Sequence, residues 1–253
     1  MPLDIEAVRV RLPGWRIEWF DTIPSTMSRA AKIAQDGCEG GALVGADEQS
    51  AGIGRQGHSW HSEKDTGLYV SMVLRLAPGL ASGNALPVAM LALGLATQEA
   101  IADVSGLAPD LRWPNDILIR GSKCAGILAQ IEAGAIVAGI GINVSQTSFP
   151  NDLATPATSL RLSGANVSRE DLLVVLVQSV ERYCKILAED GPGAILRAFE
   201  ASSSYARGRR VRAEQGGRMV EGTTRGLDAS GFLIVRQDDG REATILAGGV
   251  RPV

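Results

Sequence analysis

The alternation of apolar and polar positions changes period along the first half of the chain, and each period predicts an element. Residues 17–37, IEWFDTIPSTMSRAAKIAQDG, predict a strand, a turn and a helix that Ser25 caps and Gly37 ends. The apolar run GALVGA at 41–46 predicts a short buried strand. Residues 84–106 are apolar and rich in alanine, which predicts a largely buried helix.

Alternating, β-rich stretches follow in the middle of the chain. Residues 66–79, TGLYVSMVLRLAPG, predict a strand that Pro78 and Gly79 close. Residues 111–145, LRWPNDILIRGSKCAGILAQIEAGAIVAGIGINVS, predict three short strands joined by tight turns.

The last third of the chain changes from helix to strand. Residues 168–190 have the period of an amphipathic helix, with Ser168 as its cap and acidic residues in the first turn, and residues 193–203 predict a shorter helix. After Tyr205, short alternating strands and glycine turns predict a small SH3-like β-barrel. We therefore expect an α+β fold, a mixed sheet with flanking helices in residues 1–204 and a barrel domain in 205–253.

Composition and charge narrow the class of protein. The 253 residues are 45% hydrophobic and 21% charged with a net charge of -3, so no broad basic field is available for nucleic acid. The cysteines, Cys38, Cys124 and Cys184, have no metal-ligand spacing and predict free thiols in a reducing compartment. We see no signal peptide, no apolar run long enough to cross a membrane and no helix of any length before Ser25, and we expect a cytoplasmic protein.

The stretch ADEQSAGIGRQGHSW, residues 46–60, is the first candidate for ligand binding. Its three glycines leave backbone N–H groups able to approach an anion closely, Arg55 adds a planar cation, and Trp60 offers an aromatic face. It lacks the Gly-Lys-Ser/Thr of a P-loop and the helix that follows a dinucleotide-binding turn. On this stretch alone, a mobile surface loop with chance glycines is an equal alternative.

A second candidate lies in the hairpin RWPNDILIRGSKCAGIL. A two-residue Gly-Ser turn would pair Arg120 with Lys123 and place Asp116 and Leu118 on the same face. The backbones of Asp116 and Lys123 would then lie roughly 13 Å apart, a gap that suits a ligand held between a metal-binding acid and a carboxylate-binding lysine. Taken singly, Lys123 is more simply a solvated lysine and Asp116 a turn former; together with the glycine loop they favour a site.

These segments together resemble the catalytic domain of bacterial biotin protein ligases. The resemblance rests on GIGRQGHSW, on RWPNDILIRGSKCAGIL, on GIGINV at 139–144 and on DTIPSTMSRA at 21–30, and it covers nearly the whole chain in order. It implies a class II synthetase-like catalytic domain followed by an SH3-like barrel, of the monofunctional type that lacks an N-terminal DNA-binding domain.

The resemblance implies two half-reactions. Biotin and Mg-ATP give biotinyl-5′-AMP and pyrophosphate, and the biotinyl group then passes to a lysine of a biotin carboxyl carrier protein of the acetyl-CoA carboxylase type. The chemistry is consistent with the residues, because a carboxylate that attacks the α-phosphate needs cations where charge develops and needs no protein nucleophile. A loop that closes on the ligand would protect the mixed anhydride from water.

The resemblance also assigns residues. Lys123 and Arg55 are the catalytic candidates, with Lys123 on the biotin carboxylate. The expected biotin-binding residues are Ser25, Thr26, Met27, Gln49, Gly52, Ile53, Gly54, Arg55 and Lys123, with Ser25, Thr26 and Gln49 on the ureido group. The expected ATP-binding residues are Trp60, Asn115, Asp116, Lys123 and Asn143, with Trp60 near adenine and Asp116 on Mg²⁺.

Some residues depart from the family pattern, and other functions stay open. Ile53, Gln56 and His58 stand where the family usually has arginine, and Met27 stands where it has asparagine. A ligase for lipoate or another small acid shares the superfamily, and a peptide-binding scaffold is a further alternative. A biotin-sensing repressor would need an N-terminal helix-turn-helix, for which only about twenty residues are present. A homodimer is possible.

Overall fold

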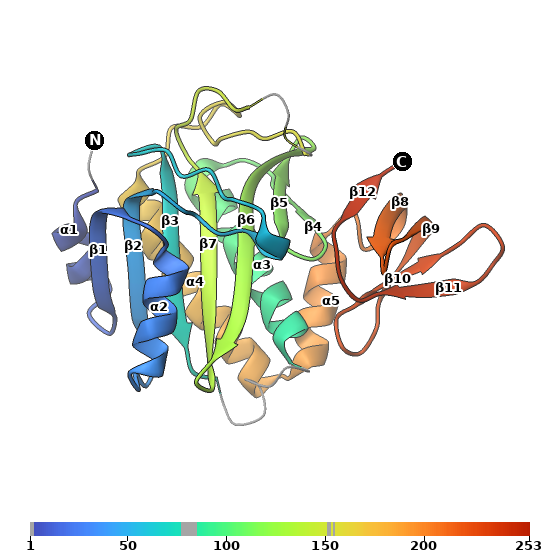
Figure 1. The fold of residues 1–253 in the computed structure, drawn as a ribbon, viewed down its shortest axis with the longest axis horizontal. Coiled ribbons are helices and arrows are strands. Elements are labelled where there is room, and N and C mark those ends of the chain that lie inside the picture. The colour runs from blue at the N-terminus through green and yellow to red at the C-terminus, as the bar shows by residue number, and fades with distance from the viewer. Residues whose placement is uncertain (1–2, 77–84, 151–152, 154) are drawn as a thin grey trace.

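The computed structural model describes residues 3–76, 85–150, 153 and 155–253, and Figure 1 shows its two sheets and their helices. The helices are α1 (Ile5–Arg11), α2 (Thr26–Gln35), α3 (Leu86–Ser105), α4 (Arg169–Glu189) and α5 (Pro192–Ser202). The strands are β1 (Arg16–Ile23), β2 (Ala42–Gln49), β3 (Gly67–Leu74), β4 (Asp110–Arg112), β5 (Asp116–Ile119), β6 (Ser122–Glu132), β7 (Ala135–Asn143), β8 (Arg207–Gln215), β9 (Arg218–Leu227), β10 (Leu233–Arg236), β11 (Glu242–Ile245) and β12 (Val250–Pro252).

The large sheet has seven strands in the order β1-β2-β3-β7-β6-β5-β4. Only β1 and β2 run parallel; each of the other neighbouring pairs in this sheet is antiparallel, so the sheet is mixed, as predicted. Helix α2 lies on one face and α3, α4 and α5 lie on the other (Figure 1). The sheet is therefore the middle of three layers.

The period-2 alternation of the central strand β7 decides what each face of the sheet carries. Ile140 and Ile142 point to the α3 and α4 side and belong to the main core. Gly139 and Gly141 point to the α2 side, where they leave bare backbone. Side chains are thus absent at two consecutive positions of β7 on the α2 side, which leaves room for other groups to approach the strand there.

The first helices agree largely with the sequence predictions. Ser25 caps α2 by accepting a hydrogen bond from the Ser28 amide, and Gly37 follows the helix in a left-handed conformation. Ser168 caps α4 in the same way. The predicted closure of β3 by Pro78 and Gly79 lies outside the described residues.

The helix α1 is one that the sequence analysis missed. Four of its seven residues are apolar, but only Val8 is buried within it. Its position is fixed by polar contacts with the start of α4, where Arg11 pairs with Asp171 and the Asp4 amide donates to Glu170. Its helical period is too short to stand out in the sequence.

The sequence analysis expected no apolar run long enough to cross a membrane, and helix α3 contradicts that expectation. Helix α3 has 20 residues with a mean hydropathy of 1.3 over its best window, enough by length and composition to span a bilayer. In this structure 67% of that window is buried, because α3 packs between the large sheet and helices α4 and α5. Its apolar surface is used by the core of the fold.

The segment 111–145 holds four strands, not three short ones, and β6 and β7 have 11 and 9 residues. The tight turn between β5 and β6 is Arg120–Gly121, with φ values of 50° and 82°, so the predicted Gly-Ser turn is wrong by one residue. Lys123 consequently pairs with Leu118 and not with Arg120, and a bulge between Ile117 and Leu118 shifts the register further. A two-residue turn with both φ values positive favours asparagine, aspartate or glycine at its first position, so Arg120 gave no sequence signal for this turn.

The C-terminal sheet has the order β11-β10-β9-β8-β12 and confirms the predicted change to short strands after Tyr205. In β8 the buried positions Val211 and Ala213 alternate with exposed ones. The buried indole of Trp113 donates to the Gly231 carbonyl at 3.0 Å, which joins the start of the Trp-Pro-Asn-Asp turn to this sheet. Burial and this hydrogen bond give Trp113 a structural role.

Phe199→Ala should show how strongly α5 is held to the core. Phe199 is 1% exposed and contacts the main core, so its truncation should lower the free energy of unfolding by about 3–5 kcal/mol. Urea unfolding measures this loss, and Leu162→Ala, at a position that is 51% exposed, is the control. A loss no larger than that of the control would show that α5 is not part of the cooperative core.

Candidate active site

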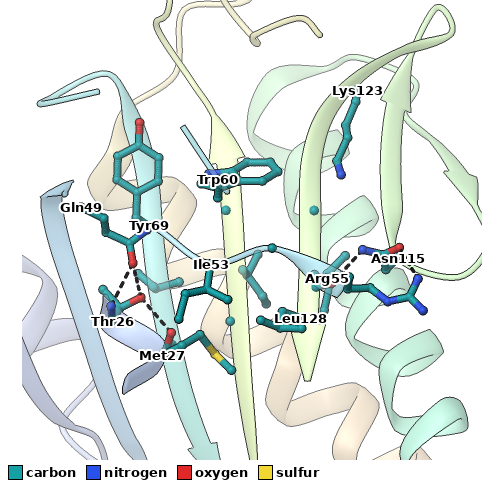
Figure 2. A pocket seen from close by; sticks show the side chains of 18 residues that line it. Thr26, Met27, Gln49, Ile53, Arg55, Trp60, Tyr69, Asn115, Lys123 and Leu128 are labelled. Atoms are coloured by element: carbon teal, nitrogen blue, oxygen red, sulfur yellow. Dashed lines mark hydrogen bonds between the residues drawn. The ribbon is translucent and has the colours of Figure 1, made fainter. Parts of the chain in front are cut away.

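An open pocket lies over β3, β7 and β6 on the α2 side of the large sheet (Figure 2). Its walls come from the start of α2, the end of β2, the glycine loop, the Trp-Pro-Asn-Asp turn and the three strands. The lining residues are Thr26, Met27, Gln49, Ile53, Gly54, Arg55, Trp60, Tyr69, Val70, Ser71, Asn115, Lys123, Gly126, Ile127, Leu128, Gly139, Ile140 and Gly141.

Two rows of directly paired residues make the floor of this pocket. Gly141 of β7 pairs with Tyr69 of β3 on one side and with Gly126 of β6 on the other. Two residues along, Gly139 pairs with Ser71 and with Leu128 in the same way. Because side chains on adjacent strands of a sheet share a face when their residues pair, each row presents a glycine at its centre.

The indole of Trp60 lies on the first row. A Cβ atom on Gly141 would come within 2.5 Å of this ring, and one on Gly126 within 2.8 Å, so only glycine permits the contact. The Trp60 Nε1 atom is buried and has no hydrogen-bond partner in the structure. Lys123 Nζ lies 5.3 Å from the ring centroid, within the range of a cation–π interaction.

The second row carries the sulfur of Met27. A Cβ atom on Gly139 would lie 2.6 Å from Met27 Sδ, so the thioether rests on bare backbone. Leu128 and Ile53 add apolar surface beside it (Figure 2). The middle of the pocket is therefore apolar and accepts an aliphatic or thioether group.

A hydrogen-bonded network closes one end of the pocket. Gln49 Oε1 accepts from the Thr26 amide at 2.9 Å and from the Thr26 hydroxyl at 3.0 Å, and Gln49 Nε2 donates to Ser62 at 2.9 Å. The Thr26 hydroxyl also lies 2.8 Å from the Ser71 hydroxyl. The polar end is thus prearranged by the N-terminus of α2, the end of β2 and the middle of β3.

The glycine loop folds as a small hairpin over the pocket. Ile53 bridges Ser59 in antiparallel fashion, and the Gly54 amide donates to the His58 carbonyl at 2.7 Å. A Cβ atom on Gly52 would lie 2.5 Å from the Trp60 carbonyl, so this glycine allows the two arms of the hairpin to approach. The expected use of these glycines as an anion cradle is wrong for Gly54, because its N–H group is already used inside the loop.

Arg55 links three parts of the chain at the opposite end of the pocket. Its Nη1 atom donates to Asn115 Oδ1 at 3.0 Å and to the Gly248 carbonyl at 3.1 Å, across 60 and 193 residues of sequence. Asn115 in turn donates to the Ile127 carbonyl. Burial lowers the pKa of Arg55 from its usual value, although nearby Asp116 acts in the opposite direction.

The side chains of Asp116 and Lys123 are in direct contact. The prediction that a ligand lies in a gap between them was therefore wrong. Lys123 Nζ lies 2.6 Å from Asp116 Oδ1, and Arg112 Nη2 lies 2.6 Å from Asp116 Oδ2. The shifted turn and the bulge bring the two backbones closer than an undistorted ladder would. Burial alone would raise the pKa of Asp116, but Lys123 and Arg112 hold it below its ordinary value.

This arrangement does not fit a protein-bound magnesium ion. Each oxygen of Asp116 already accepts from a cation, and the side-chain oxygens of Asn115 and Asn143 accept from Arg55 and Gln146. Among the described residues no group of three histidine, cysteine, aspartate or glutamate side chains is placed to hold a metal. A divalent cation at Asp116 would also face the charges of Arg112 and Lys123.

Most of the expected site residues meet in this pocket, and a few do not. Ser25, Gly52, Asp116 and Asn143 are outside its lining: Ser25 caps α2, and Asn143 is 5% exposed and donates to the Thr158 carbonyl. The sequence analysis did not assign the floor, which is Tyr69, Ser71, Gly126, Leu128, Gly139 and Gly141. The alternation of glycine and isoleucine at 139–142 was the signal for two of these.

Comparison with known proteins gives matches along most of the chain. A model of the biotin/lipoate A/B protein ligase family matches residues 19–146, and a model of the biotin protein ligase C-terminal domain matches residues 207–250. The second model is named for biotin protein ligases alone. The chain belongs to the biotin protein ligase family.

Relatives within this family cover the chain almost end to end. The biotin--[acetyl-CoA-carboxylase] ligase of Mycobacterium tuberculosis is 32% identical over 98% of this chain and 95% of its own length. That of Paracoccus denitrificans is 34% identical over 89% of this chain and 98% of its own length. The biotin protein ligase of Aquifex aeolicus, solved with biotin and ATP, has a TM-score of 0.81 at 26% identity and covers 94% of this chain and 99% of that one.

The biotin ligase fold predicted from the sequence is therefore confirmed.

The contact of Trp60 with Gly126 and Gly141, called here the glycine row, can be tested directly. Gly141→Ala places a methyl group inside the indole contact, so Trp60 should move off the floor and become more exposed to water. Its fluorescence should shift to longer wavelength and be quenched more readily by acrylamide.

The comparison is made against the same substitution in a Trp60→Phe background, which isolates the signal of Trp60 from the other tryptophans. Gly14→Ala, where nothing lies within 4 Å of the added Cβ, is the matched control. An unchanged Trp60 spectrum in Gly141→Ala would show that the glycine row does not hold the indole.

Proposed function

We propose that this protein is a biotin protein ligase that activates biotin with ATP to biotinyl-5′-AMP and transfers the biotinyl group to a lysine of a biotin carboxyl carrier protein. The observation that carries the proposal is a single pocket with a hydrogen-bonding end at Thr26 and Gln49 and a cationic end at Lys123 and Arg55. Biotin has matching ends, a ureido ring and a carboxylate. The ligases of M. tuberculosis and P. denitrificans carry this activity in their names.

The pocket orders the parts of biotin. Thr26 and Gln49 would bond the ureido group, and the apolar middle formed by Met27, Ile53 and Leu128 would hold the thioether ring and the start of the aliphatic chain. Lys123 and Arg55 would then meet the carboxylate at the opposite end (Figure 2). The indole of Trp60, which rests on Gly126 and Gly141, gives a flat surface whose other face would contact the nucleotide base.

The first half-reaction joins two anions. A carboxylate oxygen of biotin attacks the α-phosphorus of ATP, the P–O bond to the β-phosphate breaks, and pyrophosphate leaves with the electron pair. Lys123 and Arg55 would reduce the repulsion between carboxylate and phosphate and stabilise the charge that develops. The second half-reaction attaches the biotinyl carbonyl carbon to the carrier lysine nitrogen, and AMP leaves.

Asp116 would hold Lys123 in place for this chemistry. Its contact at 2.6 Å fixes the ammonium group at the wall of the pocket, and Arg112 in turn fixes Asp116. We expect Mg²⁺ to accompany ATP, but the residues present do not assign it a ligand in the protein. The segment 156–158 bonds the Lys123 backbone on both sides, because Pro156 accepts from the Lys123 amide and Thr158 donates to the Lys123 carbonyl. Asn143 would act by holding this segment through its bond to the Thr158 carbonyl, rather than by touching the nucleotide.

Several wider expectations belong to the same proposal. The C-terminal family match at 207–250 supports a domain boundary between residues 204 and 205. Three free cysteines suit the reducing cytoplasm. A homodimer through the large sheet would use β1, the terminal strand beside β2, and we expect no nucleic acid partner.

Lys123→Ala tests the proposed activity. Biotin-dependent release of pyrophosphate from Mg-ATP should fall by about a hundredfold or more, because the main cation at the reacting carboxylate is removed. Lys185→Ala, at a lysine of α4 whose side chain is 70% exposed, should leave the rate unchanged. Lipoate replaces biotin in a parallel assay. Release with lipoate and not with biotin would contradict the proposal, as would full activity of Lys123→Ala.

Asp116→Asn separates a positioning carboxylate from a metal ligand. The rate constant of adenylation should fall roughly ten- to a hundredfold, the effect of losing a hydrogen bond to a charged group, while the Mg²⁺ concentration that gives half-maximal rate stays the same. Asp21→Asn, which removes an exposed Asp–Lys pair with Lys64, is the matched control. A large rise in the required Mg²⁺ concentration would instead make Asp116 a ligand of the metal.

A further inference from the structure

We propose that Ser71, a buried residue of β3, holds the Thr26 hydroxyl in place at the polar end of the pocket by donating to it, so that Thr26 meets the ligand with one fixed acceptor. The inference rests on the proposed function, because it names how one end of the biotin site distinguishes its ligand. Ser71 is 0% exposed and would act through Thr26 as a positioning residue.

The backbone fixes the first bond of the network. The Thr26 amide can only donate, and it donates to the side-chain atom of Gln49 that lies 2.9 Å away. That atom must be the amide oxygen of Gln49 and not its nitrogen. The Gln49 nitrogen is then the atom that points to Ser62, where it donates at 2.9 Å.

The orientation of Gln49 decides that of Thr26. Because Gln49 Oε1 is an acceptor, the Thr26 hydroxyl must donate its only hydrogen in the 3.0 Å bond to that oxygen. In the 2.8 Å bond between the two hydroxyl groups, Thr26 has no hydrogen left to give. Ser71 is therefore the donor and Thr26 the acceptor in that bond.

The network leaves a defined set of free positions toward the pocket. Thr26 Oγ1 keeps one lone pair, and Gln49 Nε2 keeps one hydrogen after its bond to Ser62. The end of the pocket thus offers one acceptor and one donor side by side. A cyclic urea presents the complementary pair, a ring N–H and the adjacent carbonyl oxygen.

Removal of Ser71 would release this constraint. Without its donor, the Thr26 hydroxyl still donates to Gln49, but one of its two lone pairs is left unpaired in a buried place. The Thr26 oxygen is then held from one side only, so its acceptor is less well positioned for the ligand. A ligand with a ring N–H would lose its advantage over one in which that nitrogen is methylated. The effect on binding would be the loss of about one hydrogen bond, roughly tenfold in affinity.

The experiment is calorimetric titration with biotin in the absence of ATP, for wild type, Ser71→Ala, Thr26→Val and the double variant. We expect each single variant to raise the Kd about tenfold and the double variant to raise it no further, because Ser71 acts through Thr26. Ser71→Cys, which keeps a weak donor of similar shape, should recover part of the affinity. Biotin methylated at a ureido nitrogen should bind wild type much more weakly than biotin, and Ser71→Ala should narrow that difference.

Ser203→Ala is the matched control, since Ser203 is also buried and its hydroxyl donates to the Leu111 carbonyl, far from the pocket lining. Its melting temperature should fall as in Ser71→Ala while its Kd for biotin stays unchanged. An unchanged Kd in Ser71→Ala, or equal and additive losses in the double variant, would overturn the inference. Absence of biotin binding by the wild type would overturn the proposed function itself, and binding without pyrophosphate release would overturn only the reaction.

Discussion

The site depends on the alternation of side chains along one strand. In β7 the isoleucines at 140 and 142 fill the core beneath α3 and α4, and the same two-residue period sends Gly139 and Gly141 to the other face. A close-packed sheet normally covers both faces with side chains, so a pocket needs positions where they are missing. The glycines provide that space, and Trp60 and Met27 occupy it from above.

The charged side chains at one end of the pocket decide which ligand groups it favours. One carboxylate, that of Asp116, meets two cations, Arg112 and Lys123, and the guanidinium of Arg55 lies at the same end of the pocket. Cationic groups thus outnumber carboxylates at this end of the pocket, although the net charge of the chain is -3. Such a local surplus favours anionic groups, and its position opposite the Thr26–Gln49 end gives the pocket a polarity along its length.

The sequence predicts the helices, the strands and their layers better than the register of strand pairing and the contacts between distant residues. The capped helices, the mixed sheet and the motifs of the pocket walls follow from period and composition. The turn at Arg120–Gly121 could not be placed from the sequence, because a shift of the turn by one residue changes every paired residue in the hairpin. A bulge then adds a second shift of the register. Ser71 was hidden because a serine in an alternating strand has no local signature; only its contact with Thr26, 45 residues away, gives it a function.

Arg55 has a consequence for how such enzymes can be recombined. It hydrogen-bonds the Gly248 carbonyl, in the loop before the last strand of the C-terminal sheet. Gly248 has a φ of 85°, and a Cβ atom there would lie 2.9 Å from the Glu214 carbonyl, so this path of the backbone favours glycine. What matters is the course of the backbone there. A chimera that joined this catalytic part to the C-terminal part of a relative would keep the contact only if the loop before its last strand followed the same path, however similar the two sequences were. The compatibility of the two parts thus depends on the length and geometry of this loop and on the glycine that allows its path.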